Sequence, residues 1–159
     1  MPQASVMNEP SLHAAVADFV ANPGYHPCLL LVHPDIRRLM DASDELASAY
    51  GWPRLRVGRE LSAALLAVPP ADRPRVARQW MEEQISQMAP GPVLCTEIDL
   101  LFEPTLQLDP LRLLLDISRA TPLVVAWPGS HEDGVLAYAV PEHKHYRVWH
   151  KPQVHVVVL

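Results

Sequence analysis

Apolar residues fall into short unbroken runs along the chain, and between these runs they recur every three or four positions. Most of the runs show no alternation with polar residues, which is typical of strands buried on both faces of a parallel sheet. Residues 54–57 do alternate, so we expect that strand nearer an edge. The pattern predicts five strands, over residues 28–32, 54–57, 93–98, 123–127 and 154–159.

The stretches between the runs have the period of helices. Apolar residues of the first stretch share one helical face, and Ser11 is expected as its N-cap. Asp109 is expected to cap a later helix that begins at Pro110. Pro128 and Gly129 are expected to end the strand before them. Further helices are predicted over residues 39–50, 61–68 and 76–85, and a small hairpin is predicted to pair residues 137–140 with 146–149.

Strands that alternate with helices predict an α/β fold in three layers, with a mostly parallel five-stranded sheet, helices on both faces and a small C-terminal hairpin. We expect one domain over residues 25–159, with residues 1–24 forming an N-terminal helix packed on it. In such sheets, ligands bind beyond the carboxyl ends of the strands. The loops that meet this condition are residues 33–36, 58–60, 96–103 and 128–134.

The composition is that of a soluble protein of 159 residues, 49% hydrophobic and 19% charged, a length that suits one compact domain. No run of about 18 apolar residues predicts a membrane span. The N-terminal residues show no basic and apolar pattern of a secretory leader. Cys28 and Cys95 both lie in apolar runs and are expected as reduced core thiols. We therefore expect a cytoplasmic protein without membrane contact.

Charge is unevenly placed around a formal net charge of −5. Residues 37–78 hold eight Arg against five acidic residues, whereas residues 79–135 hold nine acidic residues against two Arg. A protein that grips nucleic acid usually has a basic surplus, so a DNA-contacting role would depend on the arginines from Arg54 to Arg78 alone. The alternative is that these arginines lie on solvated helix faces.

Several short motifs follow one another in the C-terminal part of the chain. They are LFEP (101–104), DPLRLL (109–114), ISR (117–119), WPG (127–129), DG (133–134), LAYA (136–139) and PEHKHY (141–146). In this order they resemble the BrxF family, small P-loop proteins of type-three BREX bacteriophage-exclusion systems, and the resemblance extends over about residues 27–159. It implies a P-loop-NTPase-like α/β fold. It also implies a family-motif surface at Glu103, Asp109, Arg112, Arg119, Trp127, Asp133, Tyr138, His143 and Tyr146.

The chain departs from this family at the phosphate-binding loop after the first strand. Such a loop has the form GxxxxGK[ST], in which backbone amides surround the phosphates and the Lys reaches their oxygens. At the matching positions both glycines are absent, Leu39 replaces the lysine and Met40 replaces the hydroxyl. The degenerate nucleotide-loop positions are His33, Pro34, Asp35, Arg37 and Arg38.

The second nucleotide motif is altered as well. A Walker B strand ends in an Asp that holds Mg²⁺, and Thr96 stands at that position here. Glu97 and Asp99 follow closely, so Thr96, Glu97 and Asp99 form a degenerate Walker B region. Both carboxylates lie on the same side of an extended segment, where they would either chelate Mg²⁺ or only cap loops.

The resemblance therefore implies a non-catalytic, pseudo-NTPase adaptor or regulatory subunit of a bacteriophage-defence complex, which holds no ATP, Mg²⁺ or metal. The implied partners are the other BREX proteins: the large ATPase, the phosphatase-like protein, the adenine methyltransferase and a helicase, with DNA contact through the complex. Whether the protein forms a homo-oligomer stays an open question at this point. Two alternatives also stay open, namely an ATPase subunit completed by a partner and a DNA-contacting module that uses Arg54–Arg78.

Histidines and aromatic residues are two further groups with possible functional roles. The eight histidines show none of the spacings typical of a zinc site. The aromatic group of Trp127, Tyr138, Tyr146 and Trp149 predicts either a partner-docking surface, since aromatic residues anchor interfaces, or a second core under the hairpin.

Overall fold

Five parallel strands form the centre of the molecule. The computed structural model describes residues 9–159, with side chains from residue 12. The parallel strands run in the order β2-β3-β4-β1-β7. Their bounds are Cys28–His33 for β1, Arg54–Arg56 for β2, Val93–Thr96 for β3, Leu123–Glu132 for β4 and His155–Val158 for β7. The predicted α/β class with a mostly parallel sheet is confirmed.

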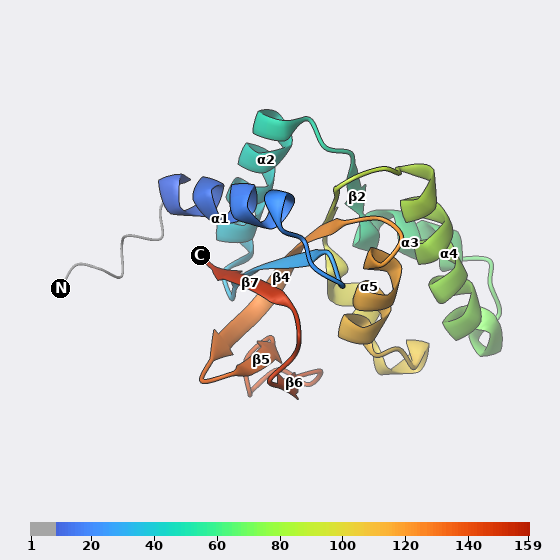
Figure 1. Cartoon of the computed structure of the whole chain (residues 1–159). Helices are drawn as coiled ribbons and strands as arrows, with labels where there is room; N and C mark the ends of the chain where they lie inside the picture. The colour runs from blue at the N-terminus through green and yellow to red at the C-terminus, as the bar shows by residue number, and fades with distance from the viewer. Residues whose placement is uncertain (1–8) are drawn as a thin grey trace.

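Helices cover both faces of this sheet (Figure 1). The helices α1 (Glu9–Ala21) and α2 (Ile36–Tyr50) pack on one face, where Leu29 and Leu31 of β1 point. On the other face, Cys28, Leu30 and Val32 of β1 share a core with α3 (Val57–Leu65), α4 (Arg73–Gln87) and α5 (Pro110–Ser118). Alternate residues of one strand thus feed two separate cores, which explains why the strand sequences are apolar throughout.

Several elements begin or end away from their predicted positions. The first helix starts at Glu9, so Ser11 lies inside its first turn and is not the N-cap. Pro10 is tolerated there because the first N–H groups of a helix have no intrahelical partner. The third strand ends at Thr96, because Glu97 has a positive φ of 58° that turns the chain out of the sheet. Short 3-10 helices follow over Ile98–Phe102 (η3) and Pro104–Leu106 (η4), and another precedes α4 over Pro70–Asp72 (η2).

The prediction that Pro128 and Gly129 end the fourth strand is wrong. The strand β4 continues to Glu132 and pairs in antiparallel fashion with β5 (Val135–Tyr138), which in turn pairs with β6 (Arg147–His150). The turn between β4 and β5 is made by Asp133 and Gly134, both at positive φ, as a two-residue hairpin requires. The strand can continue through position 129 because glycine has no Cβ. A Cβ there would lie only 1.8 Å from the carbonyl oxygen of Ala137.

The aromatic residues near this hairpin form a core. Trp127 is fully buried, and its Nε1 donates a hydrogen bond to the Ala137 carbonyl at 3.0 Å. Phe102 stacks on Tyr138 with ring centroids 3.6 Å apart and meets Trp127 edge-on at 5.2 Å. Trp149 of β6 packs edge-on against Trp127, with ring centroids 5.4 Å apart. The docking-surface interpretation is therefore wrong for Trp127 and Tyr138, which lie beneath the hairpin rather than on the family-motif surface.

We predict that Gly129→Ala destabilises the fold by about 1–3 kcal/mol or more, because the added methyl group meets the backbone of β5 and one strand has to move. The matched control is Ser130→Ala on the neighbouring position of β4, with an expected change within about 0.5 kcal/mol. Urea denaturation of both variants measures the difference. Equal stability of the two variants would contradict the close contact between β4 and β5.

Candidate functional site

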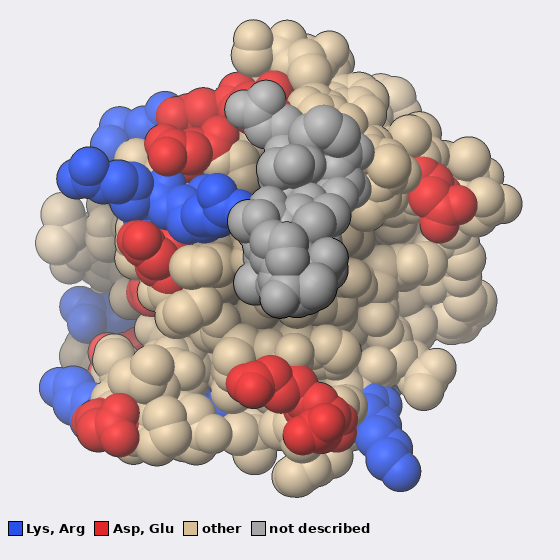
Figure 2. All heavy atoms as spheres, turned by 90° about the vertical axis from the view of Figure 1, so that its left-hand side faces the viewer, with Lys and Arg blue, Asp and Glu red and all other residues tan. Residues whose placement is uncertain are grey.

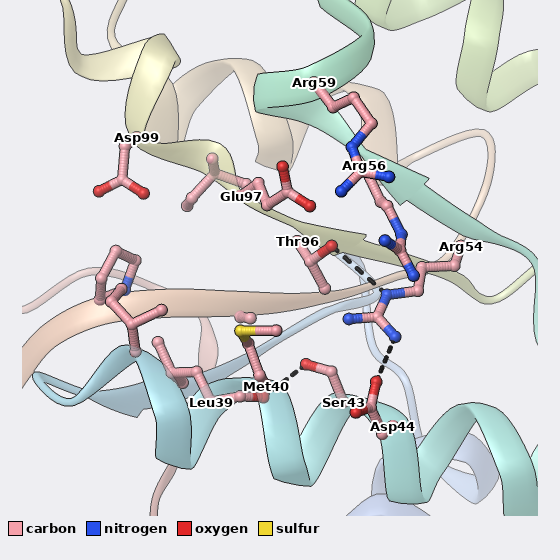
Figure 3. A pocket seen from close by; sticks show the side chains of 14 residues that line it. Leu39, Met40, Ser43, Asp44, Arg54, Arg56, Arg59, Thr96, Glu97 and Asp99 are labelled. Atoms are coloured by element: carbon pink, nitrogen blue, oxygen red, sulfur yellow. Dashed lines mark hydrogen bonds and ion pairs between the residues drawn. The ribbon is translucent and has the colours of Figure 1, made fainter.

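A cavity of about 320 Å³ opens at the carboxyl ends of β2 and β3. It lies between α2, the start of α3, the segment after β3 and the middle of β4 (Figure 3). The helix α2 contributes apolar side chains and Asp44, and most of the charged side chains come from the other walls. The lining residues are Ile36, Leu39, Met40, Ser43, Asp44, Arg54, Arg56, Arg59, Thr96, Glu97, Ile98, Asp99, Ala126 and Pro128.

The degenerate nucleotide-loop positions form a tight turn beside this cavity. Only Pro34 and Asp35 separate β1 from α2. The Asp35 amide donates to His33 Nδ1 at 3.0 Å, and the Arg37 amide donates to Asp35 Oδ1 at 2.9 Å. Asp35 is thus the N-cap of α2, a role that satisfies an amide without an intrahelical partner. The amides of residues 35 and 37 are engaged within the chain, and the Asp35 carboxylate lies at the N-terminus of α2.

None of the five nucleotide-loop positions lines the cavity. His33 is half-buried, and Pro34, Asp35, Arg37 and Arg38 are exposed. The degenerate Walker B region, in contrast, does reach it. Thr96 is buried and its hydroxyl accepts a long hydrogen bond from Arg54 Nε at 3.5 Å. The structure therefore brings the end of β3 together with α2, but not with the turn after β1.

Both carboxylates after β3 face the cavity from exposed positions. Glu97 sits at the turn of the chain, where Gly58 at the start of α3 packs so closely that a Cβ would lie 3.0 Å from the Glu97 carbonyl oxygen. Asp99 accepts a hydrogen bond from the Tyr138 hydroxyl at 2.7 Å. Burial, and then this carboxylate, raise the pKa of Tyr138 well above its usual value.

Three arginines line the cavity although the sequence analysis did not name them as site residues. Arg54 is held by an ion pair with Asp44 of α2 at 2.6 Å. Arg56 and Arg59 follow at the end of β2 and in the first turn of α3. For Arg59 the signal was present, because it lies in residues 58–60, which were expected near ligands. Arg54 and Arg56 lie in β2 itself and had no such signal.

The Arg54–Arg78 stretch does not form one basic stripe. Arg54 lies in the cavity wall, whereas Arg73 donates from Nε to the Val68 carbonyl and Arg75 lies 3.8 Å from Asp72 near the start of α4. On the face seen in Figure 2, basic side chains lie beside acidic side chains at the upper left, and further basic side chains lie at the lower left and lower right. The DNA-contacting module stays a prediction.

The family-motif positions do not converge on one site. Asp109 caps α5 by accepting from the Arg112 amide, and it also accepts from Trp149 Nε1, each at 3.1 Å. Arg112 is exposed and lies 3.4 Å from Asp116. The others are spread over separate elements. Glu103 lines a second cavity near Leu66, Arg119 lies over the Tyr25 ring, Asp133 forms the β4–β5 turn, His143 meets the Tyr138 ring and Tyr146 is partly exposed.

Metal and thiol chemistry find no further support. Among residues 9–159, no group of three or more His, Cys, Asp or Glu side chains is placed to hold a metal ion. Complete burial raises the pKa of the Cys95 thiol to about 12, and Cys28 is shifted in the same direction. In the same part of the chain, no helix has the length and apolar character needed to cross a membrane.

Comparisons of the chain with family models, curated proteins and solved structures gave no match.

We predict that Tyr138→Phe changes how stability depends on high pH. In the native protein the pKa of Tyr138 is raised, so its contribution to stability is present below pH about 10 and falls as the unfolded phenol ionises above it. The Phe variant lacks this ionisation and should lose less stability between neutral pH and pH about 11. Urea denaturation at both pH values measures this, with Tyr146→Phe as control on an exposed ring. Identical pH dependence of native protein and Tyr138→Phe would refute the buried Tyr138–Asp99 contact.

Proposed function

We propose that this protein is a non-catalytic, pseudo-NTPase adaptor or regulatory subunit of a BREX-type bacteriophage-defence complex, built on a P-loop-like α/β scaffold. The observation that carries the proposal is the two-residue turn between β1 and α2. A phosphate-binding loop at this place needs several free amides and a lysine. The turn has its amides engaged by His33 and Asp35, and Leu39 points into a core instead of reaching a phosphate.

The other half of a nucleotide site is equally incomplete. Strand β4 lies between β1 and β3, so Glu97 and Asp99 stand across one strand from the closed turn. A carboxylate can hold Mg²⁺ for phosphoryl transfer only where the phosphates share that ion. Without a cradle for the phosphates, the two carboxylates have no reaction to serve at this strand end. This supports a role in assembly rather than in hydrolysis.

The resemblance to the defence family is carried by the motifs over residues 101–146. Asp109, Trp127 and Tyr138 have structural duties, as a helix cap and as core aromatics. Arg112 has no such duty, because its side chain is 67% exposed and its ion pair with Asp116 lies at the surface. An exposed motif residue without a structural task is suited to contact a partner, and we place the docking surface on this side of α5.

We predict that a tagged copy of the protein expressed in its native host retains the large ATPase, the phosphatase-like protein or the methyltransferase of the defence system. Arg112→Glu should abolish this retention and lower protection against phage by about tenfold or more, since reversing a charge at an interface costs several kcal/mol. Arg75→Glu on α4 is the matched control, because Arg75 is also an exposed arginine in a weak surface pair.

Both variants should fold, as judged from their melting temperatures, because surface ion pairs contribute little to stability. Retention of partners by the Arg75→Glu variant and their loss from the Arg112→Glu variant would support the assignment. If neither the native protein nor the control retains any protein of the system, the adaptor role is wrong. If Arg112→Glu behaves as Arg75→Glu does, docking through this side of α5 is wrong.

A further inference from the structure

The charged side chains of the cavity divide into a closed pair and an open set. Arg54 and Asp44 neutralise each other at 2.6 Å. The open set is Arg56, Arg59, Glu97 and Asp99, and within the described part of the chain none of these four side chains forms an ion pair. Two positive and two negative groups sum to zero, so the cavity does not attract a polyanion by net charge.

The open charges are separated in space rather than mixed. Figure 3 shows Arg56 and Arg59 at one end of the cavity, Asp99 at the other and Glu97 between them. The hydrogen bond from Tyr138 fixes one oxygen of Asp99 at 2.7 Å and leaves the other free to accept. Guanidinium groups match carboxylate and phosphate groups, and a carboxylate matches an ammonium group. The cavity thus has a positive and a negative end.

An apolar floor connects the two ends. Leu39 and Met40 of α2 lie below the charged residues in Figure 3, and Ala126 of β4 adds to this wall. Met40 is half-exposed although it is apolar, as is Ile36 beside it. A volume of about 320 Å³ is near the lower limit of ligand cavities, which indicates a small molecule.

We propose that this cavity binds a small zwitterion. Its anionic group, a carboxylate or a phosphate, pairs with Arg56 and Arg59; its ammonium group pairs with Asp99, and a short apolar chain between them lies on Met40. A ligand that is only anionic could pair with Arg56 and Arg59 but would leave the Asp99 carboxylate without a cation. This inference goes beyond the adaptor role and does not depend on it.

The test uses purified full-length protein and ligand-observed NMR. The probes are γ-aminobutyrate, ε-aminohexanoate and aminoethyl phosphate, with butyrate and butylamine as single-charge halves. At least one zwitterion should bind about tenfold more tightly than either half, because two charge-assisted contacts act together. A preference for aminoethyl phosphate would assign a phosphate ligand, and the reverse a carboxylate ligand.

Three variants locate the binding. Arg56→Gln combined with Arg59→Gln, and separately Asp99→Asn, should each weaken it by about tenfold, whereas Arg75→Gln on α4 should leave it unchanged. Asparagine keeps an oxygen that can accept the hydrogen bond from Tyr138. The Asp99→Asn variant should therefore lose the negative charge but still fold. The proposal is overturned if no zwitterion binds, if butyrate alone binds as well, or if the cavity variants match Arg75→Gln. Because no partner is present, this outcome is independent of the result in phage-infected cells.

Discussion

The structure depends most on one small constraint, the capping of α2 by Asp35 directly after β1. A parallel strand that leads into a helix presents free amides at its carboxyl end, and proteins use such amides to bind phosphates. Here His33 and Asp35 take up the amides of residues 35 and 37, and the capping group itself carries a negative charge. The same interaction that starts the helix therefore closes the place where an anion would bind.

With that position closed, the cavity lies between α2 and the carboxyl ends of β2 and β3. The arginines after β2 and the carboxylates after β3 meet there because β2 and β3 are neighbours in the sheet and both end at this edge. Their charges balance within the cavity, in contrast to the strongly positive surroundings that a triphosphate requires. The architecture retains the general position of an α/β ligand site but has a different chemistry.

Much of the fold was predictable because the central strands β1, β3 and β4 carry apolar residues for two cores, and this leaves a clear signal in the sequence. The errors came from contacts between distant residues. The continuation of β4 through Gly129 depends on the close approach of Ala137, and the aromatic core depends on Phe102 from a separate segment. The start of α2 at Ile36 was a missed local signal, since Asp35 is a common N-cap residue. The location of the cavity was predicted, since each of the four segments expected near ligands contributes to its lining. The arrangement of its charges was not predictable, because Asp44, Arg54 and Asp99 come from three elements whose proximity only the sheet order defines.

The most direct test of the closed turn is an amide-resolved NMR titration of the protein with Mg-ATP. The amide resonances of residues 33 and 35–40 should stay in place up to millimolar nucleotide, because the amides of residues 35 and 37 already have partners and Asp35 repels the phosphates. Saturable shifts of these amides, with an affinity in the micromolar range, would show that the turn opens to hold a triphosphate and would contradict the account.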